Sequence, residues 1–134
     1  MDKTYIDKLA WIEIADRKVL ETQSHNKDTW YIPGGKREVG ESDEAALTRE
    51  VKEELCVDLD PSSIEHYGTF EAQAHGKPEG TIVRMTCYRA KYSGELKPSA
   101  EVAKMDWFTY AQKELTSPVD HLIFDDLKAK NLID

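Results

Sequence analysis

The most regular pattern of apolar and polar positions lies between residues 43 and 55. At about 100° per residue, Leu47, Val51 and Leu55 form an apolar stripe, and a stripe of glutamates lies beside it. The segment contains no glycine or proline, and Ser42 precedes it as a good N-cap. The pattern therefore predicts a helix whose core-facing side is edged by carboxylates.

Before this helix, apolar positions predict two strands and a short third one. Residues 9–14 and 19–23 are rich in strand formers and are separated by an Asp-Arg-Lys turn. Residues 30–32 form the third strand, which leads through a proline into Gly34 and Gly35. Glycines there allow the backbone to approach a metal or phosphate, although the pair could equally serve a tight turn.

After the helix, the pattern changes to alternation typical of strands. Residues 64–74 and 81–92 are expected to be strands, residues 98–104 a loop, and residues 107–109 a further short strand. Ser117 begins a last helix as its N-cap, with a proline in the first turn. Strands on both sides of one helix, with a second helix at the end, predict an α/β fold with a mixed sheet covered on both faces.

Composition places this fold in one globular domain covering residues 1–134, with 40% apolar and 33% charged residues. A net charge of −8 argues against a nucleic acid polymer as partner. No apolar run reaches the roughly 20 residues of a membrane span, and the N-terminus lacks the apolar core of a signal peptide. We expect a cytoplasmic monomer or homodimer in which Cys56 and Cys87 are reduced thiols.

The acidic stripe of the first helix carries the candidate chemistry. Glu50, Glu53 and Glu54 stand at i, i+3 and i+4, where ionised side chains repel one another. A divalent cation such as Mg²⁺ would offset this repulsion, since it prefers oxygen ligands. An isolated pattern of this kind is more often a solvated face of a helix.

The surrounding sequence favours the metal. Gly35, five residues, Glu41, seven residues and then residues 49–57 (REVKEELCV) match the signature box of the Nudix hydrolases at every fixed position but one. Residues 30–35 also resemble the strand and turn that lead into this box. The departure is Cys56, where the family usually has a glycine that caps the helix in the left-handed conformation. The chain is thus identified as a small, MutT-like member of the family, which implies a Nudix-like α/β/α sandwich.

This resemblance also assigns the metal ligands. It implies metal binding by Glu53 and Glu54, with Glu50 as a further ligand or as the base that activates water. A backbone carbonyl at Gly34 or Gly35 is expected to complete the protein's ligand set. The implied cofactor is Mg²⁺, with Mn²⁺ as a substitute.

The remaining site residues each have two candidate roles. Arg49 is expected to orient a carboxylate of the box, or else to form an ordinary surface ion pair. Glu41 is an outer ligand or supports the ligands, and Lys36 either reaches a phosphate or is solvated. Glu101 lies six residues before Trp107, a spacing at which MutT-like enzymes place an acid at the metal site. It is therefore a second candidate base, with a solvated loop glutamate as the alternative.

Substrate contacts are predicted at fewer positions. Asp120 resembles a residue that reads the base edge in MutT-like enzymes, but an acid in the first turn of a helix also suits the helix dipole. Gln23 and Ser24 stand where such enzymes often have an arginine that faces the phosphates. Three basic residues are candidate substitutes: Lys27, Lys36 and Arg84.

The resemblance implies a Mg²⁺-dependent hydrolase of a nucleoside diphosphate linked to another group, acting on a small-molecule nucleotide. The expected reaction is MutT-like, in which a nucleoside triphosphate gives the monophosphate and pyrophosphate. ADP-ribose or a nucleotide sugar is the alternative substrate, although the positions of a family marker for ADP-ribose hold Gln73 and Ala74. A non-catalytic nucleotide-binding module is the alternative of another class, and the intact glutamates of the box favour the enzyme.

Overall fold

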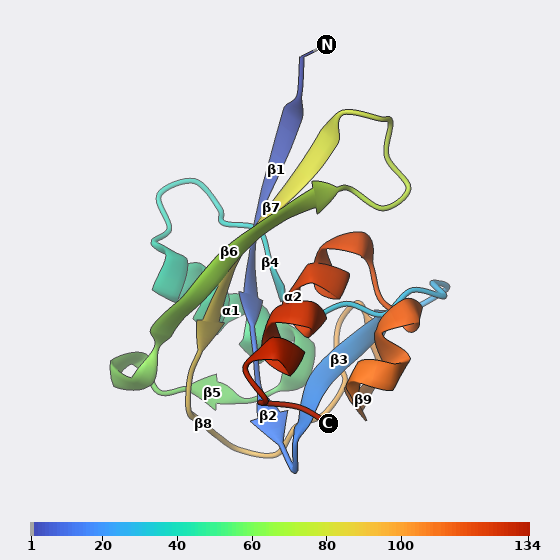
Figure 1. Ribbon diagram of the computed structural model, residues 1–134. Coiled ribbons are helices and arrows are strands. Elements are labelled where there is room, and N and C mark those ends of the chain that lie inside the picture. The colour runs from blue at the N-terminus through green and yellow to red at the C-terminus, as the bar shows by residue number, and fades with distance from the viewer. Residues whose placement is uncertain (1) are drawn as a thin grey trace.

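The computed structural model describes residues 2–134 and has a four-stranded mixed sheet at its centre (Figure 1). Its strands, in spatial order, are β4 (Gly34–Gly35), β1 (Thr4–Trp11), β7 (Thr81–Arg89) and β6 (Glu65–Gln73). Strands β1 and β7 are parallel, and the other neighbours are antiparallel. Helices α1 (Asp43–Leu55) and α2 (Pro118–Ala129) pack on opposite faces of this sheet. The predicted α/β/α arrangement is confirmed.

Smaller elements complete the domain. A second sheet has the order β2-β3-β9, and β5 pairs with β8 as a separate ribbon. Their bounds are β2 Ile14–Ala15, β3 Lys18–Ser24, β9 Val102–Phe108, β5 Asp58–Leu59 and β8 Tyr92–Ser93. Short 3₁₀ helices cover Pro61–Ser63 and Tyr110–Leu115. Within residues 2–134, every helix is too short or too polar to cross a membrane.

Alternation along β1 divides the apolar side chains between two cores. Leu9 and Trp11 pack with Leu47 and its neighbours on the α1 side of the sheet. Ala10, on the opposite face, packs with Phe124 and its neighbours on the α2 side. Successive strand residues point to opposite faces, so each position in β1 belongs to one core or the other.

Helix α1 has the predicted bounds and the predicted cap. The Ser42 hydroxyl accepts a hydrogen bond from the Ala45 amide at 3.1 Å. Cys56 ends the helix in the left-handed conformation, with φ +63°, and its amide donates to the Lys52 carbonyl at 3.0 Å. The usual glycine is absent, but the backbone conformation that it favours is kept.

Three strand predictions were wrong in extent because they considered each segment without its partner. Strand β1 begins at Thr4 rather than residue 9, since it pairs with β7 along its whole length. Residues 30–32 make only isolated bridges, and the strand lies at the following glycines, which pair with β1. The predicted strand 81–92 ends at Arg89, and Tyr92 starts β8 instead.

The predicted loop over residues 98–104 is also partly wrong. Strand β9 begins inside it at Val102 and pairs with β3, with an irregularity of register between Gln23 and Ser24. Glu101 therefore lies immediately before the first residue of β9. At the start of α2, Ser117 occupies the predicted N-cap position, but its side chain makes no capping hydrogen bond.

Candidate active site

Arg49 is the centre of an ion-pair network on α1. Its guanidinium forms two 2.8 Å hydrogen bonds with the two carboxylate oxygens of Glu41 and a 2.7 Å bond with Glu50. It also donates to the Lys36 carbonyl at 3.1 Å, which ties the glycine turn to the helix. These bonds to Arg49 lower the pKa of Glu41 to about 2. Arg49 thus holds two carboxylates and the turn in one arrangement.

The glycine turn fits closely against these carboxylates. A Cβ atom on Gly35 would collide with the carboxylate of Glu50, so a larger residue there would displace it. Gly34 has φ +151°, and a Cβ atom on it would collide with the Leu9 carbonyl. The glycine pair therefore serves both the turn and the close approach of the backbone to the acidic side chains.

Glu54 lies deepest among the acidic side chains of the helix. One of its carboxylate oxygens accepts a hydrogen bond from the Gly34 amide at 3.0 Å. Burial, together with the charges of Glu50, Glu101 and Glu53, raises the pKa of Glu54 to about 8. Burial likewise raises the pKa of Glu50. The site concentrates carboxylates, and Arg49 forms ion pairs with Glu41, Glu50 and Glu53 among them.

A cavity brings three of the predicted acids together with the turn. Glu50, Glu54 and Glu101 line it with Gly34 and Gly35. Glu53 is not among its lining residues; its side chain is 53% exposed and lies 3.4 Å from Arg49. Within residues 2–134, no three acidic, histidine or cysteine groups converge closely enough to form a complete metal centre by themselves.

The lining of this cavity nevertheless suits a hard divalent cation. Its donors are carboxylate and backbone oxygens, which Mg²⁺ and Mn²⁺ prefer, and Mg²⁺ usually keeps several waters or substrate phosphates as ligands. A cation would also compensate the buried charge of Glu54 and its neighbours. Glu50, Glu54 and Glu101 would hold it, with a carbonyl of the glycine turn.

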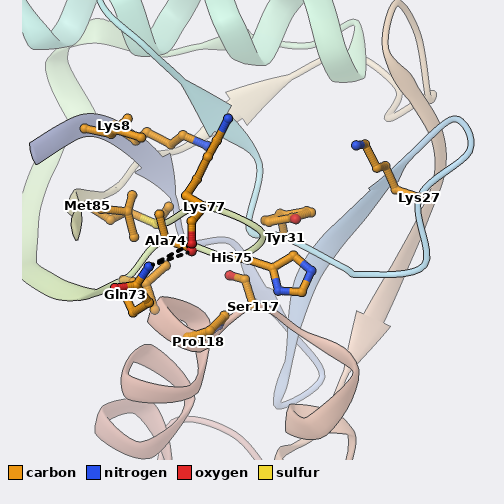
Figure 2. Close-up of a pocket in the computed structure, with 13 residues that line it drawn as sticks. Lys8, Lys27, Tyr31, Gln73, Ala74, His75, Lys77, Met85, Ser117 and Pro118 are labelled. Atoms are coloured by element: carbon orange, nitrogen blue, oxygen red, sulfur yellow. Dashed lines mark hydrogen bonds between the residues drawn. The ribbon is translucent and has the colours of Figure 1, made fainter. Parts of the chain in front are cut away.

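A second cavity continues from the first, and Lys8, Lys27, Tyr31 and Met85 line both. Figure 2 shows Lys8 extending from β1 across this second cavity, with Lys77 rising from the loop between β6 and β7. Its remaining lining is largely apolar or aromatic and comes from the sheet and the start of α2. The two cavities together form one cleft, which runs from the carboxylates to an apolar end.

The loop between β6 and β7 is held beside the cleft by Gln73. Its amide nitrogen donates to the Lys77 carbonyl at 3.2 Å and to the Pro78 carbonyl at 2.9 Å, and its oxygen accepts from the Gly80 amide at 3.1 Å. His75 hydrogen-bonds Thr29 at 3.1 Å and joins this loop to the one after β3. These hydrogen bonds hold the loop between β6 and β7 in one conformation at the apolar end of the cleft.

Two of the predicted substrate contacts, Arg84 and Asp120, lie away from the cleft. Arg84 is on the opposite face of β7 from Met85, where it pairs with Glu71 at 2.8 Å and stacks over Tyr5. Alternation along the strand directs its side chain away from the cavities, which argues against a phosphate contact. Lys36, in contrast, lines the acidic cavity.

Asp120 is fully buried beneath the apolar end and lines neither cavity. One of its oxygens accepts from the Ile32 amide at 2.9 Å. Glu21 lies against it, also fully buried, and burial raises the pKa of Asp120 to about 7 and that of Glu21 well above its usual range. Neither Glu21 oxygen nor the second Asp120 oxygen has a hydrogen-bond partner within residues 2–134. We therefore expect the pair to hold a proton between its carboxyl groups.

Lys8 and Glu21 were not predicted from the sequence. Each occupies an inward-facing strand position: Lys8 lies between Ile6 and Ala10 in β1, and Glu21 lies two residues after Val19 in β3. A charged residue within such an alternating apolar row was the available signal. For Lys8, this signal required the start of β1, which the pairing with β7 establishes, whereas Glu21 lies inside the predicted strand 19–23.

Comparison with known proteins identifies the family of this chain. A family model described as the NUDIX domain matches residues 9–125. That match covers most of the chain, and the chain belongs to the Nudix hydrolase family. A search of curated proteins found no significant match.

Solved structures show the same fold over nearly the whole chain. The Escherichia coli ORF135 protein is 24% identical, with a TM-score of 0.73 and coverage of 98% of this chain and 96% of that one. A MutT protein from Methanosarcina mazei is 19% identical, with a TM-score of 0.74 and 98% coverage of both chains. A mutator MutT protein from Bacillus halodurans is 28% identical, with a TM-score of 0.68 and coverage of 89% and 79%.

Proposed function

We propose that this Nudix hydrolase is a Mg²⁺-dependent, MutT-like pyrophosphohydrolase that converts a nucleoside triphosphate to its monophosphate and pyrophosphate. The observation that carries the proposal is the continuous cleft, which has carboxylates at one end and an apolar lining that includes Ile6, Val83 and Val119 at the other. A nucleoside polyphosphate has the same polarity: an anionic chain that requires a cation, joined to a flat apolar ring system. The MutT proteins among the structural relatives support this choice.

Bound Mg²⁺ would neutralise charge that develops on the phosphate oxygens during hydrolysis. Glu50, Glu54 and Glu101 would hold the ion, and Arg49 keeps Glu50 in place through their 2.7 Å ion pair. The oxygen of a water molecule forms a bond to phosphorus while the bond from phosphorus to the bridging oxygen breaks. The proton of the water passes to a protein carboxylate, and the bridging oxygen leaves with one of the two products.

Two side chains are candidates for the proton acceptor, and their contacts differ. Glu50 is held by Arg49 at 2.7 Å, so one of its carboxylate oxygens is already engaged in an ion pair, although burial raises the pKa of Glu50 overall. Glu101 lines the same cavity, is exposed, and has no ion-pair partner within residues 2–134. This difference favours Glu101 as the acceptor, through a carboxylate oxygen that does not bind the ion, and Glu50 as a charge-neutralising ligand.

The test is product analysis on nucleoside triphosphates, oxidised nucleotides, ADP-ribose and nucleotide sugars, with and without Mg²⁺. Wild-type protein should release pyrophosphate and monophosphate from a triphosphate only when Mg²⁺ is present. Glu54→Gln should reduce this rate at least 100-fold, and Glu101→Gln should lower kcat more than it changes KM. Glu44→Gln serves as the comparison, because Glu44 is an exposed glutamate of α1 that lines neither cavity.

The outcomes separate the alternatives. Cleavage confined to ADP-ribose or a nucleotide sugar would keep the catalytic helix and overturn the substrate. Equal, trace hydrolysis by the wild-type and Glu54→Gln proteins would instead identify a nucleotide-binding module without catalysis.

A further inference from the structure

Lys8 is the most unusual side chain of the cleft. It lies on the α2-facing side of β1 in a row with Ile6 and Ala10, in register with Met85 of β7. A lysine in an otherwise apolar, inward-facing row is destabilising unless its charge has a use or a partner. Burial accordingly lowers the pKa of the Lys8 ammonium.

No partner for this charge lies within hydrogen-bonding distance in residues 2–134. The charged groups that influence Lys8 lie further away: Lys36 and Lys77 repel it, and Asp120 and Glu54 attract it. Glu54 lines the acidic cavity, whereas Lys77 lines the apolar one. The ammonium is thus an unsatisfied cation between the two ends of the cleft.

Its position specifies which part of a substrate it meets. Lys8 lines both cavities, so a ligand that extends from the carboxylates to Val83 and Val119 passes beside it. On the proposed function, the outer phosphates lie at the acidic end and the nucleoside at the apolar end. The group at the junction is then the phosphate attached directly to the nucleoside.

We propose that Lys8 binds the phosphate that remains with the nucleoside after cleavage. This inference rests on the proposed function for the orientation of the ligand. A phosphate there gives the ammonium its missing anionic partner and offsets the repulsion from Lys36 and Lys77. Lys8 also distinguishes a nucleotide from a free nucleoside, because a free nucleoside lacks the negative charge of the phosphate.

The experiment measures binding of reaction products, which does not require turnover. Wild-type, Lys8→Met and Lys8→Arg proteins are titrated calorimetrically with the four common nucleoside 5′-monophosphates, the matching nucleosides and inorganic pyrophosphate, all with Mg²⁺. Lys18→Met is the matched control, because Lys18 is an exposed lysine of β3 that lines neither cavity. Thermal unfolding of each variant verifies that the fold is retained.

Lys8→Met should weaken binding of the preferred monophosphate at least 10-fold and leave nucleoside and pyrophosphate binding within twofold of wild type. Lys8→Arg should recover much of the loss because it keeps the positive charge. With the preferred triphosphate, Lys8→Met should lower kcat/KM by 10- to 100-fold, whereas Lys18→Met should have no effect.

Three results would overturn the assignment. The first is an equal loss of nucleoside and monophosphate binding, which would indicate a packing role. The second is a loss confined to pyrophosphate, which would place Lys8 at the outer phosphates. The third is a wild-type protein that binds no monophosphate. Monophosphate binding that depends on Lys8 in a protein without triphosphate hydrolysis would reject the proposed function and keep the phosphate site.

Discussion

Lys8 and Glu21 show how single charged residues are accommodated inside this fold. Both lie on the α2 side of the sheets, and both interact with Asp120: Lys8 through its charge and Glu21 through a shared proton. Isolated buried charges are costly, so each tends to be neutralised, paired or used. Glu21 and Asp120 neutralise one another by holding a proton, whereas Lys8 keeps a charge that faces the cleft.

Glu21→Gln should stabilise the protein above pH 7 and reduce the dependence of its stability on pH. Burial raises the pKa of Asp120 to about 7 and that of Glu21 well above its usual range. The folded state therefore binds more protons than the unfolded state from about pH 4 upward, and the free energy of unfolding falls as pH rises, by roughly 1.4 kcal/mol per pH unit for each extra proton. Glutamine cannot ionise, and its amide can donate to Asp120. Urea unfolding between pH 5 and 9 measures this slope.

Glu65→Gln is the control, because Glu65 is an exposed strand glutamate. It should leave the slope of the wild-type protein unchanged. Parallel slopes for the wild-type and Glu21→Gln proteins would show that the buried pair holds no shared proton.

At the scale of elements, local signals predicted α1 well and the strands less well. The bounds of α1 follow from residues within the segment: a capping serine, a 3.6-residue apolar period and an uninterrupted run. The limits of β1, β8 and β9 depend on pairing with segments far away in the chain. Pairing between distant segments gives little local signal in a single sequence. The strand register therefore had to come from the structure, and so did the positions of Lys8 and Arg84 relative to the cleft.

The end of α1 offers a test of one local signal. Cys56→Gly should increase the free energy of unfolding by about 1 kcal/mol. Cys56 has φ +63°, and a residue with a side chain costs about 1–2 kcal/mol in this left-handed conformation. Part of this gain is offset because glycine loses more conformational entropy on folding. Glycine is also the residue that the Nudix box normally has here. Urea unfolding at a fixed pH measures the change.

Cys56→Ala separates strain from chemistry, since it removes the thiol and keeps a Cβ atom in the left-handed conformation. It should have nearly wild-type stability. A gain by the alanine variant equal to that of the glycine variant would mean that the thiol, rather than the backbone, limits stability.

At the scale of the molecule, the distribution of charge matters more than its sum. The net charge of −8 disfavours anions in general, yet four lysines line the cleft: Lys8, Lys27, Lys36 and Lys77. A small anionic substrate meets these lysines, whereas a long polyanion would also meet the acidic surface. Within the cleft, the carboxylates lie at the acidic end, where Glu50, Glu54 and Glu101 line the cavity.

Mg²⁺ should therefore stabilise the whole domain. At a concentration 100 times its Kd, a ligand of the folded state contributes about 2.7 kcal/mol, and a domain of this size gains about 3 °C in Tm per kcal/mol. Glu54→Gln should abolish this shift without lowering the Tm measured in EDTA, because its side-chain oxygen can still accept from the Gly34 amide, 3.0 Å away in the wild type. Glu44→Gln, at an exposed position of α1, should keep the full shift. Differential scanning calorimetry measures the Tm of each protein with Mg²⁺ and with EDTA. An equal increase in Tm on adding Mg²⁺ to the wild-type and Glu54→Gln proteins would exclude Glu54 as a ligand.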